Sequence, residues 1–252
     1  MKIQIASDLH TEFEENRAFL NLYPIKPVAP ILILAGDIKI LNHHSDDHYD
    51  FLKYVSDHWE QTYIVPGNHE FYHFGDLSTA FDLDLELYSN VKYLNHQRIE
   101  LDHFEVFFST LWSKAEPLVE SMISDFKNCK YGSEDYTIAH HNHLHVEAVK
   151  WLNQELSKPK TKPRVVASHF VPCWAADAFP KGFNERGIAM KDYYTAKLDD
   201  QIQKWDVDFW IYGHNHYNRD SKLGNTQFVS NMLGYVFRDN PDSFRGDKVI
   251  EV

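Results

Sequence analysis

The apolar residues of this chain gather into short runs, and five of these runs have the length and composition of buried strands. Most are continuous stretches of Ile, Leu, Val and aromatic residues, a pattern typical of strands buried on both faces. The predicted strands span residues 2–7, 31–35, 61–65, 164–168 and 208–212. Between the second and third, Phe51, Leu52 and Val55 recur at helical spacing and predict a helix over 43–59. This alternation favours βαβ units and a mainly parallel first sheet.

The remaining apolar patterns predict further helices and a second group of strands. A stripe of Leu77, Phe81, Leu85 and Tyr88 predicts a helix over 76–89, and helices are also expected over 115–125, 139–156 and 193–204. Short runs with tight connections predict an antiparallel meander over 91–94, 98–101 and 104–108. Runs over 227–230, 234–237 and 248–251 are expected to be the closing antiparallel strands of a second sheet, and 11–30 is expected to be irregular.

Polar residues follow each of the five predicted buried strands at the point where the strand ends. Ligands in open α/β sheets bind just past the carboxyl ends of strands, so these positions are where we expect chemistry. Carboxylate, imidazole and amide groups are all ligands for divalent metals. Glycines in three of the motifs let the backbone turn sharply off the strand. The five motifs are Asp8-x-His10, Gly36-Asp37, Gly67-Asn68-His69-Glu70, His169 and Gly213-His214-x-His216.

The number of candidate ligands indicates two metal ions. The set comprises Asp8, His10, Asp37, Asn68, His169, His214 and His216. Seven ligands are too many for one ion, but they suit two ions that share a bridging carboxylate, an arrangement that serves in-line displacement at phosphorus. Ligands of these types suit Mn, Fe or Zn, with Co and Ni as further options, and suit Mg less well.

The ordered set of motifs resembles the calcineurin-like metallophosphoesterase superfamily, and the match extends from Asp8 to His216. The resemblance implies an α/β fold, a four-layer α/β/β/α sandwich of two mixed β-sheets flanked by helices. In the Ser/Thr protein phosphatases of this superfamily a second Asp and an Arg follow Gly-Asp. Here Ile38-Lys39-Ile40-Leu41 follows instead, so the chain looks more like the small bacterial-type phosphohydrolases.

The resemblance also implies a role for each motif residue. One ion would be held by Asp8, His10 and His216, the other by Asn68, His169 and His214, and Asp37 would bridge them. A metal-bound hydroxide would attack phosphorus in line. His69 matches the catalytic histidine that contacts the phosphate and protonates the departing alkoxide. Glu70 is assigned no chemistry beyond orienting the turn.

Composition narrows the class of protein. The 252 residues are 43% hydrophobic and 25% charged, which predicts a single globular domain over residues 1–252. No apolar run approaches the ~20 residues of a membrane span, and no signal peptide is recognised, so we expect no membrane partner. Cys129 and Cys173 are too few for a disulfide framework, which predicts a cytoplasmic protein with structural thiols. The net charge of −12 disfavours nucleic acid as a partner.

These observations predict a dinuclear metal-dependent phosphoesterase that hydrolyses small-molecule phosphomonoesters or phosphodiesters. One alternative is a nuclease of the same fold. Another, from a different class, is a metal-poor protein-interaction module on this fold. Loops over 115–139 and 171–191 are expected to set substrate specificity. The sequence leaves the substrate, the native metal pair and the oligomeric state open.

Two further polar clusters have alternative interpretations. His43, His44, Asp46, Asp47 and His48 are expected to form a polar loop that caps the following helix. His140, His141, His143 and His145 are expected at a solvated helix start, with a wall of the substrate pocket as the alternative. In that cluster, His141 and His145 would share one helix face.

Overall fold

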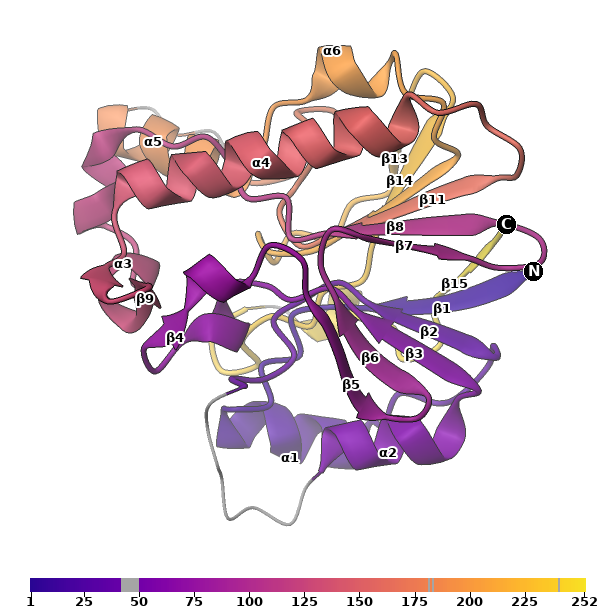
Figure 1. The fold of residues 1–252 in the computed structure, drawn as a ribbon. Helices are drawn as coiled ribbons and strands as arrows, with labels where there is room; N and C mark the ends of the chain where they lie inside the picture. The colour runs from indigo at the N-terminus through magenta and orange to yellow at the C-terminus, as the bar shows by residue number, and fades with distance from the viewer. Residues whose placement is uncertain (42–49, 181, 183, 240) are drawn as a thin grey trace.

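Two six-stranded mixed sheets lie face to face in the computed structural model, which describes residues 1–41, 50–180, 182, 184–239 and 241–252 (Figure 1). The first sheet has the order β15 (Val249–Glu251), β1 (Lys2–Ala6), β2 (Ile31–Leu34), β3 (Gln61–Ile64), β6 (Val91–Leu94) and β5 (Asp84–Tyr88). The second has the order β13 (Ser221–Leu223), β14 (Thr226–Ser230), β12 (Phe209–Tyr212), β11 (Arg164–Ser168), β8 (Glu105–Ser109) and β7 (Gln97–Glu100). A small third sheet joins β10 (Glu134–Asp135), β9 (Cys129–Tyr131) and β4 (Gly75–Asp76).

Helices cover the outer face of each large sheet. Helices α1 (Glu14–Leu22) and α2 (Phe51–His58) lie against the first sheet, and α4 (Ile138–Leu156) and α6 (Asp199–Ile202) lie over the second (Figure 1). Buried leucines of these helices, such as Leu52 and Leu152, pack in the corresponding outer cores. The four-layer α/β/β/α arrangement predicted from the sequence is therefore confirmed.

The core between the two sheets is built from branched aliphatic side chains. Ile5 and Ile33 of the first sheet share one buried cluster with Val106, Val165 and Ile211 of the second. Each such side chain, when fully buried, contributes roughly 1.5–3 kcal/mol to folding. Because the strands alternate sides, the residues between these face the helices, which explains the continuous apolar runs.

Parallel register aligns the strand ends that carry the motifs. In the first sheet Leu34 is paired with both Ala6 and Ile64, and in the second Ala167 is paired with Ile211. Strands β1, β2 and β3 therefore end level with one another, as do β11 and β12. The loops that follow them emerge at one edge of the sandwich.

The helix predicted over 76–89 is wrong. The chain there forms β4, a 3₁₀ turn η2 (Leu77–Thr79) and the edge strand β5. Leu83, Leu85 and Leu87 alternate with acidic residues, a period-2 pattern that the i, i+4 stripe of larger side chains obscured. Strand β5 pairs antiparallel with β6, so the meander predicted over 91–108 is divided: β6 joins the first sheet, while β7 and β8 join the second.

Two other predicted helices are shorter and are interrupted. In place of 115–125 there is a 3₁₀ turn η3 (Pro117–Ser121) followed by α3 (Asp125–Asn128), because buried Asp125 is held by contacts to other loops. In place of 193–204 there are α5 (Glu185–Tyr194) and α6. The backbone between them bonds to the loop after β11, with the amides of Ala196 and Leu198 donating to Val171 and Pro172.

The N-terminal and C-terminal predictions also need correction. Helix α1 lies within 11–30, which was expected to be irregular. In the tail, β14 is parallel to β12, while β15 pairs antiparallel with β1 in the first sheet, so the tail completes both sheets. Segment 234–237 is not a strand: the amide of Tyr235 donates to Asp239 and that of Val236 donates to Asn16, so side chains replace a neighbouring strand. Two further 3₁₀ turns are η1 (His69–Phe71) and η4 (Pro241–Ser243).

The two polar histidine-containing clusters have different outcomes in the structure. His43, His44, Asp46, Asp47 and His48 lie outside the described residues, and the described part of the predicted helix is α2. His141 and His145 share a face of α4 as expected, but that face points into the core, where both are buried. The solvated helix start is therefore wrong for these two.

Two composition-based expectations can be compared with the structure. Cys129 and Cys173 are both free and buried, as the structural interpretation expects. Across the part of the chain that is described, the helices are too short or too polar to span a membrane.

Candidate metal centre

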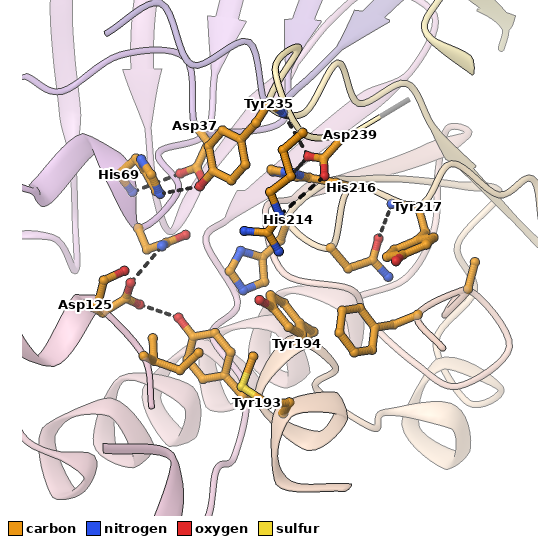
Figure 2. Close-up of a pocket in the computed structure, with 18 of the residues that line it drawn as sticks. Asp37, His69, Asp125, Tyr193, Tyr194, His214, His216, Tyr217, Tyr235 and Asp239 are labelled. Carbon is orange, nitrogen blue, oxygen red and sulfur yellow. Dashed lines mark hydrogen bonds and ion pairs between the residues drawn. The ribbon is translucent and has the colours of Figure 1, made fainter. Parts of the chain in front are cut away.

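The candidate ligands from all five strand ends converge at one edge of the sandwich. Asp8 and His10 follow β1, Asp37 follows β2, and Asn68 follows β3, all in the first sheet. His169 follows β11, and His214 and His216 follow β12, in the second sheet. Figure 2 shows Asp37, His214 and His216 around one pocket, with His69 beside Asp37. The site thus forms where the loops of the two sheets meet.

The first cluster of ligand atoms comprises Asp8, His10 and His216, whose candidate atoms lie within 4.8 Å of one another. The Nε2 atoms of His10 and His216 are 3.1 Å apart. The Nε2 of His216 is 3.4 Å from Oδ1 of Asp8. All three atoms therefore surround one point.

The second cluster comprises Asp37, His169 and His214, again within 4.8 Å of one another. The Nε2 of His169 lies 3.0 Å from Nδ1 of His214 and 3.1 Å from Oδ1 of Asn68. The Oδ2 of Asp37 is 3.4 Å from this Nε2 and 3.8 Å from Nε2 of His10 in the first cluster. Asp37 therefore lies between the two clusters.

Hydrogen bonds on the outer side of three candidate histidines decide which of their atoms faces inward. The Nδ1 of His10 is 3.1 Å from the Glu12 carboxylate, that of His216 is 2.5 Å from the Asp239 carboxylate, and that of His169 is 2.8 Å from the carbonyl of Ala35. These oxygens accept, so each Nδ1 carries a proton and each Nε2 faces the cluster, where its lone pair becomes available when a cation displaces the proton on it.

The Asn68 amide is oriented in the same manner. Its Nδ2 donates to the Asp125 carboxylate over 2.9 Å, which leaves Oδ1 facing His169. Acceptor atoms thus face acceptor atoms at close range in both clusters, and the Nε2 of His214 is buried without a partner among the described residues. Such an arrangement is repulsive unless positive charge lies between the acceptors, so the donor set fits divalent cations.

The pKa values of the four candidate histidines move in two directions: burial lowers those of His10 and His214, whereas carboxylates raise those of His169 and His216. Burial lowers the pKa of His169, but the Asp37 carboxylate outweighs it and raises that pKa to about 9. Burial likewise opposes protonation of His216, yet Asp239 and Asp8 raise its pKa to about 9. Although burial favours the neutral acid, the neighbouring imidazoles hold the pKa of Asp37 well below its usual range. The cluster therefore attracts cationic charge.

Five candidate ligands adopt left-handed backbone conformations. The φ angles of Asp8, His10, Asp37, His214 and His216 are 53°, 45°, 54°, 81° and 57°. Asp and His tolerate this region better than most residues, but it still costs energy relative to the right-handed region. The sharp turns take the chain off the line of each strand, so that the side chains of these residues reach the centre.

Glycine is required beside two of the candidate ligands. A Cβ on Gly36, whose φ is +85°, would lie 2.4 Å from Nδ1 of His169. A Cβ on Gly67 would lie 2.2 Å from Oδ1 of Asp37. The close approach expected from the sequence is therefore present at both positions.

His69 lies beside the ligand cluster and is held on three sides. Its Nδ1 is 2.8 Å from Oε1 of Glu12, its ring stacks on Tyr72 with centroids 4.1 Å apart, and its backbone amide donates to Asp37. The Nε2 is 3.2 Å from the hydroxyl of Tyr235. Burial lowers the pKa of His69, but the Asp37 and Glu12 carboxylates outweigh it and raise that pKa. A raised pKa favours the protonated imidazole, which is the form that a proton donor needs.

Glu70 joins the turns after β2 and β3. Its carboxylate accepts from the backbone amides of Gly67, Asp37 and Ile38 at 2.8–3.0 Å. Burial and the nearby Asp37 charge raise the pKa of Glu70 to about 7, while these amides oppose the rise. The role in orienting the turn that the sequence analysis allowed is therefore visible in the structure.

Sequence reasoning missed four residues that support the site. Glu12 contacts both His10 and His69, and its place two residues after His10 extends the first motif to Asp-x-His-x-Glu, a signal that was available. Asp125 begins the short helix α3, and Tyr235 and Asp239 lie in an irregular segment of the C-terminal tail. No spacing connects them to the motifs, so only the fold reveals them.

The comparisons with known proteins agree with this geometry. A curated relative, "Uncharacterized protein L509" of Acanthamoeba polyphaga mimivirus, is 23% identical over 94% of this chain and 92% of its own length. The solved structure of "Phosphopantetheinyl Hydrolase (PptH) from Mycobacterium tuberculosis" has a TM-score of 0.67 at 17% identity, covering 96% of this chain and 90% of that one. The pattern of the calcineurin-like phosphoesterase family matches residues 1–218, and the chain therefore belongs to that family.

Proposed function

We propose that this protein is a dinuclear metal-dependent phosphoesterase that hydrolyses small-molecule phosphomonoesters or phosphodiesters. Membership of the calcineurin-like phosphoesterase family makes it a metal-dependent hydrolase. The observation that carries the finer proposal is the pair of inward-facing acceptor clusters joined by Asp37. Two clusters with one carboxylate between them fit two cations better than one.

We assign Asp8, His10 and His216 to one cation and Asn68, His169 and His214 to the other, with Asp37 shared. Nitrogen-rich ligands of this kind favour Mn, Fe or Zn, with Co and Ni also compatible. When bound, such cations stabilise the negative charge of a phosphate group and make water a better nucleophile.

We assign to His69 the protonation of the leaving group. His69 lines the pocket, where its Nε2 lies beside the hydroxyl of Tyr235, while Glu12 holds its Nδ1. As the bond between phosphorus and the ester oxygen breaks, the Nε2 proton passes to that oxygen, and the imidazolium becomes neutral. Glu12 stabilises the protonated form before the transfer, because its carboxylate accepts from Nδ1–H.

The substrate is proposed to be a small molecule rather than a nucleic-acid polymer. The net charge of −12 opposes binding to a polyanion, since phosphate contacts along a polymer require many Lys and Arg residues. A phosphopantetheinyl ester belongs among the substrates tested, because a solved structure of similar fold carries that name.

The proposal is tested by removing the metals and then restoring them. Protein stripped with a chelator should be inactive on p-nitrophenyl phosphate and bis-p-nitrophenyl phosphate, and Mn²⁺ should restore activity. Asp37→Asn should abolish turnover and lower the metal content measured by elemental analysis. His69→Ala should lower kcat for butyl phosphate, whose leaving alkoxide needs a proton, by about 10²-fold or more with the metal content retained. Unchanged turnover in both variants, or wild-type protein that binds no metal, would overturn the assignment.

A further inference from the structure

A cavity of about 820 Å³ opens directly beside the candidate ligands. Asp37, His214 and His216 lie along one side of it (Figure 2), and Asn68 also lines it. The other sides come from residues 122–125, 178–179, α5 and the segments after β12 and β14. Parts of the two loops predicted to set specificity, 115–139 and 171–191, thus line the space next to the reacting phosphate.

The walls of this cavity away from the candidate ligands are rich in aromatic rings. Tyr194 packs against the candidate ligand His214, with ring centroids 4.9 Å apart. Phe179 lies next, 4.7 Å from Tyr194 and 5.5 Å from Tyr217 on its other side. A continuous aromatic surface therefore runs outward from the metal centre, and such surfaces bind flat or aliphatic groups.

Thioether and aliphatic side chains extend this apolar surface. Met190 of α5 and Met122 both line the cavity and are half-buried. Ile123 is 8% exposed and lines it as well. Met side chains adapt to ligands of irregular shape, so these residues suit an apolar body of variable form.

The charged residues of the cavity are already engaged. The Asp125 carboxylate accepts from Asn68 and Tyr72, and Asp239 accepts from His216. Arg238 is the one Lys or Arg among the described lining residues, and its 75%-exposed side chain lies 4.0 Å from Asp239. A second phosphate or a carboxylate on the substrate would need buried cationic partners, which these walls do not offer.

We propose that this cavity binds the alcohol portion of the phosphoester, and that this portion is uncharged with an aromatic or aliphatic body. The inference rests on the proposed function, because the cavity is assigned to the group that the hydrolysis releases. The proposal excludes nucleoside polyphosphates and sugar bisphosphates as substrates, because they carry further negative charge.

The first test uses pairs of esters of equal length. Butyl phosphate and the phosphate monoester of 4-hydroxybutanoate differ only in a terminal carboxylate. We expect kcat/KM to be at least about tenfold higher for the butyl ester, because the carboxylate would be desolvated without a partner. Calorimetric binding of butylphosphonate and 3-carboxypropylphosphonate should show the same order. Equal or reversed preference overturns the inference.

The second test places a charge in the wall. Met190→Glu should lower kcat/KM for butyl phosphate by at least about tenfold while changing that for methyl phosphate little. Ile188→Glu is the matched control, since Ile188 lies on the same helix but is 54% exposed and outside the cavity. Tyr217→Ala provides a second variant at a 43%-exposed cavity residue. Equal losses on both esters in Met190→Glu and Tyr217→Ala overturn the inference.

Failure of the two proposals would look different. If metal-loaded protein hydrolyses methyl phosphate and p-nitrophenyl phosphate but shows no preference between the paired esters, only the assignment of the cavity fails. If it hydrolyses no phosphoester at all, the proposed function fails and this inference fails with it.

Discussion

Individual hydrogen bonds from neighbouring side chains orient the candidate ligands and the proposed proton donor. Glu12 accepts from Nδ1 of both His10 and His69, and its side chain is 7% exposed. Burial raises its pKa, but these two bonds and the charges of the two imidazoles outweigh it and lower that pKa to about 2. One carboxylate therefore orients a candidate ligand and the proposed proton donor together.

A substitution at Glu12 should affect proton donation more than phosphate binding. Glu12→Gln keeps the shape but removes the charge that stabilises protonated His69. We predict that kcat falls about 10²-fold for butyl phosphate, whose leaving alkoxide needs a proton, and much less for p-nitrophenyl phosphate, whose phenolate leaves without one. Glu14→Gln, at the exposed start of α1, is the control. Equal losses on both substrates would contradict the role.

His141 provides a residue-scale prediction away from the site. Tyr136 and Ser113 hydrogen-bond its Nδ1 and Nε2, and it is fully buried. Burial, aided by the nearby His145, lowers its pKa from 6.5 to about 3. The unfolded chain therefore takes up a proton first, so the stability is fully present above pH 6.5 and is lost as the pH falls toward 3.

At pH 5 this loss amounts to about 2 kcal/mol. His141→Gln removes the titrating group, so its deficit in unfolding free energy relative to wild type should shrink by about that amount between pH 7.5 and pH 5. Urea unfolding at the two pH values measures it, with His103→Gln on the exposed β7–β8 turn as control. A deficit that does not change with pH would exclude this role.

At the scale of elements, the strands were predictable and several helices were not. The five motif strands are buried on both faces, so their sequence pattern reflects one environment throughout. Segment 82–88 carries both a period-2 and a helical pattern, and only pairing with β6 decides between them. The break before α3 depends on the contacts of Asp125 with Asn68 and Tyr72, which local sequence does not encode.

The same distinction applies to the site. The motif residues were recognisable because each directly follows a strand, and the sheets then bring them together. Asp239 and Tyr235 lie in a tail segment that resembles a strand in composition, and their position depends on bonds to His216 and His69. The segments that form the cavity walls were predictable, but helix α5 within one of them and the aromatic surface were not.

The turns after β2 and β3 act as one element because Glu70 bridges them. In Glu70→Gln one acceptor oxygen becomes a donor, so at least one of the buried amides of Gly67, Asp37 and Ile38 loses its partner. We predict a loss of about 1–3 kcal/mol in unfolding free energy, measured in chelator so that metal binding does not contribute. Glu60→Gln, exposed just before β3, should change stability by less than about 0.5 kcal/mol. Comparable effects of the two would refute the bridge.

At the scale of the whole molecule, the site belongs to neither sheet alone. Asp8, Asp37 and Asn68 come from the first sheet, while His169 and His214 come from the second. The shared core between the sheets holds the two sets of loops at fixed separation. Because that core contains residues of both sheets, we infer that residues 1–252 fold as one unit.

The left-handed backbone at five candidate ligands lowers the stability of the fold while it gives the site the geometry that the proposed activity needs. His214 combines a φ of 81° with a buried Nε2 that has no partner in the described part of the chain, and each feature disfavours the folded state by roughly 1 kcal/mol or more. Asn tolerates this conformation, so metal-free His214→Asn should melt no lower than metal-free wild type, whereas with Mn²⁺ present wild type should melt higher. A lower Tm for the metal-free variant would contradict this. A lineage released from selection for catalysis would thus lose this histidine without losing its fold. Neutral substitutions would remove the candidate ligands before they disrupted the four-layer fold.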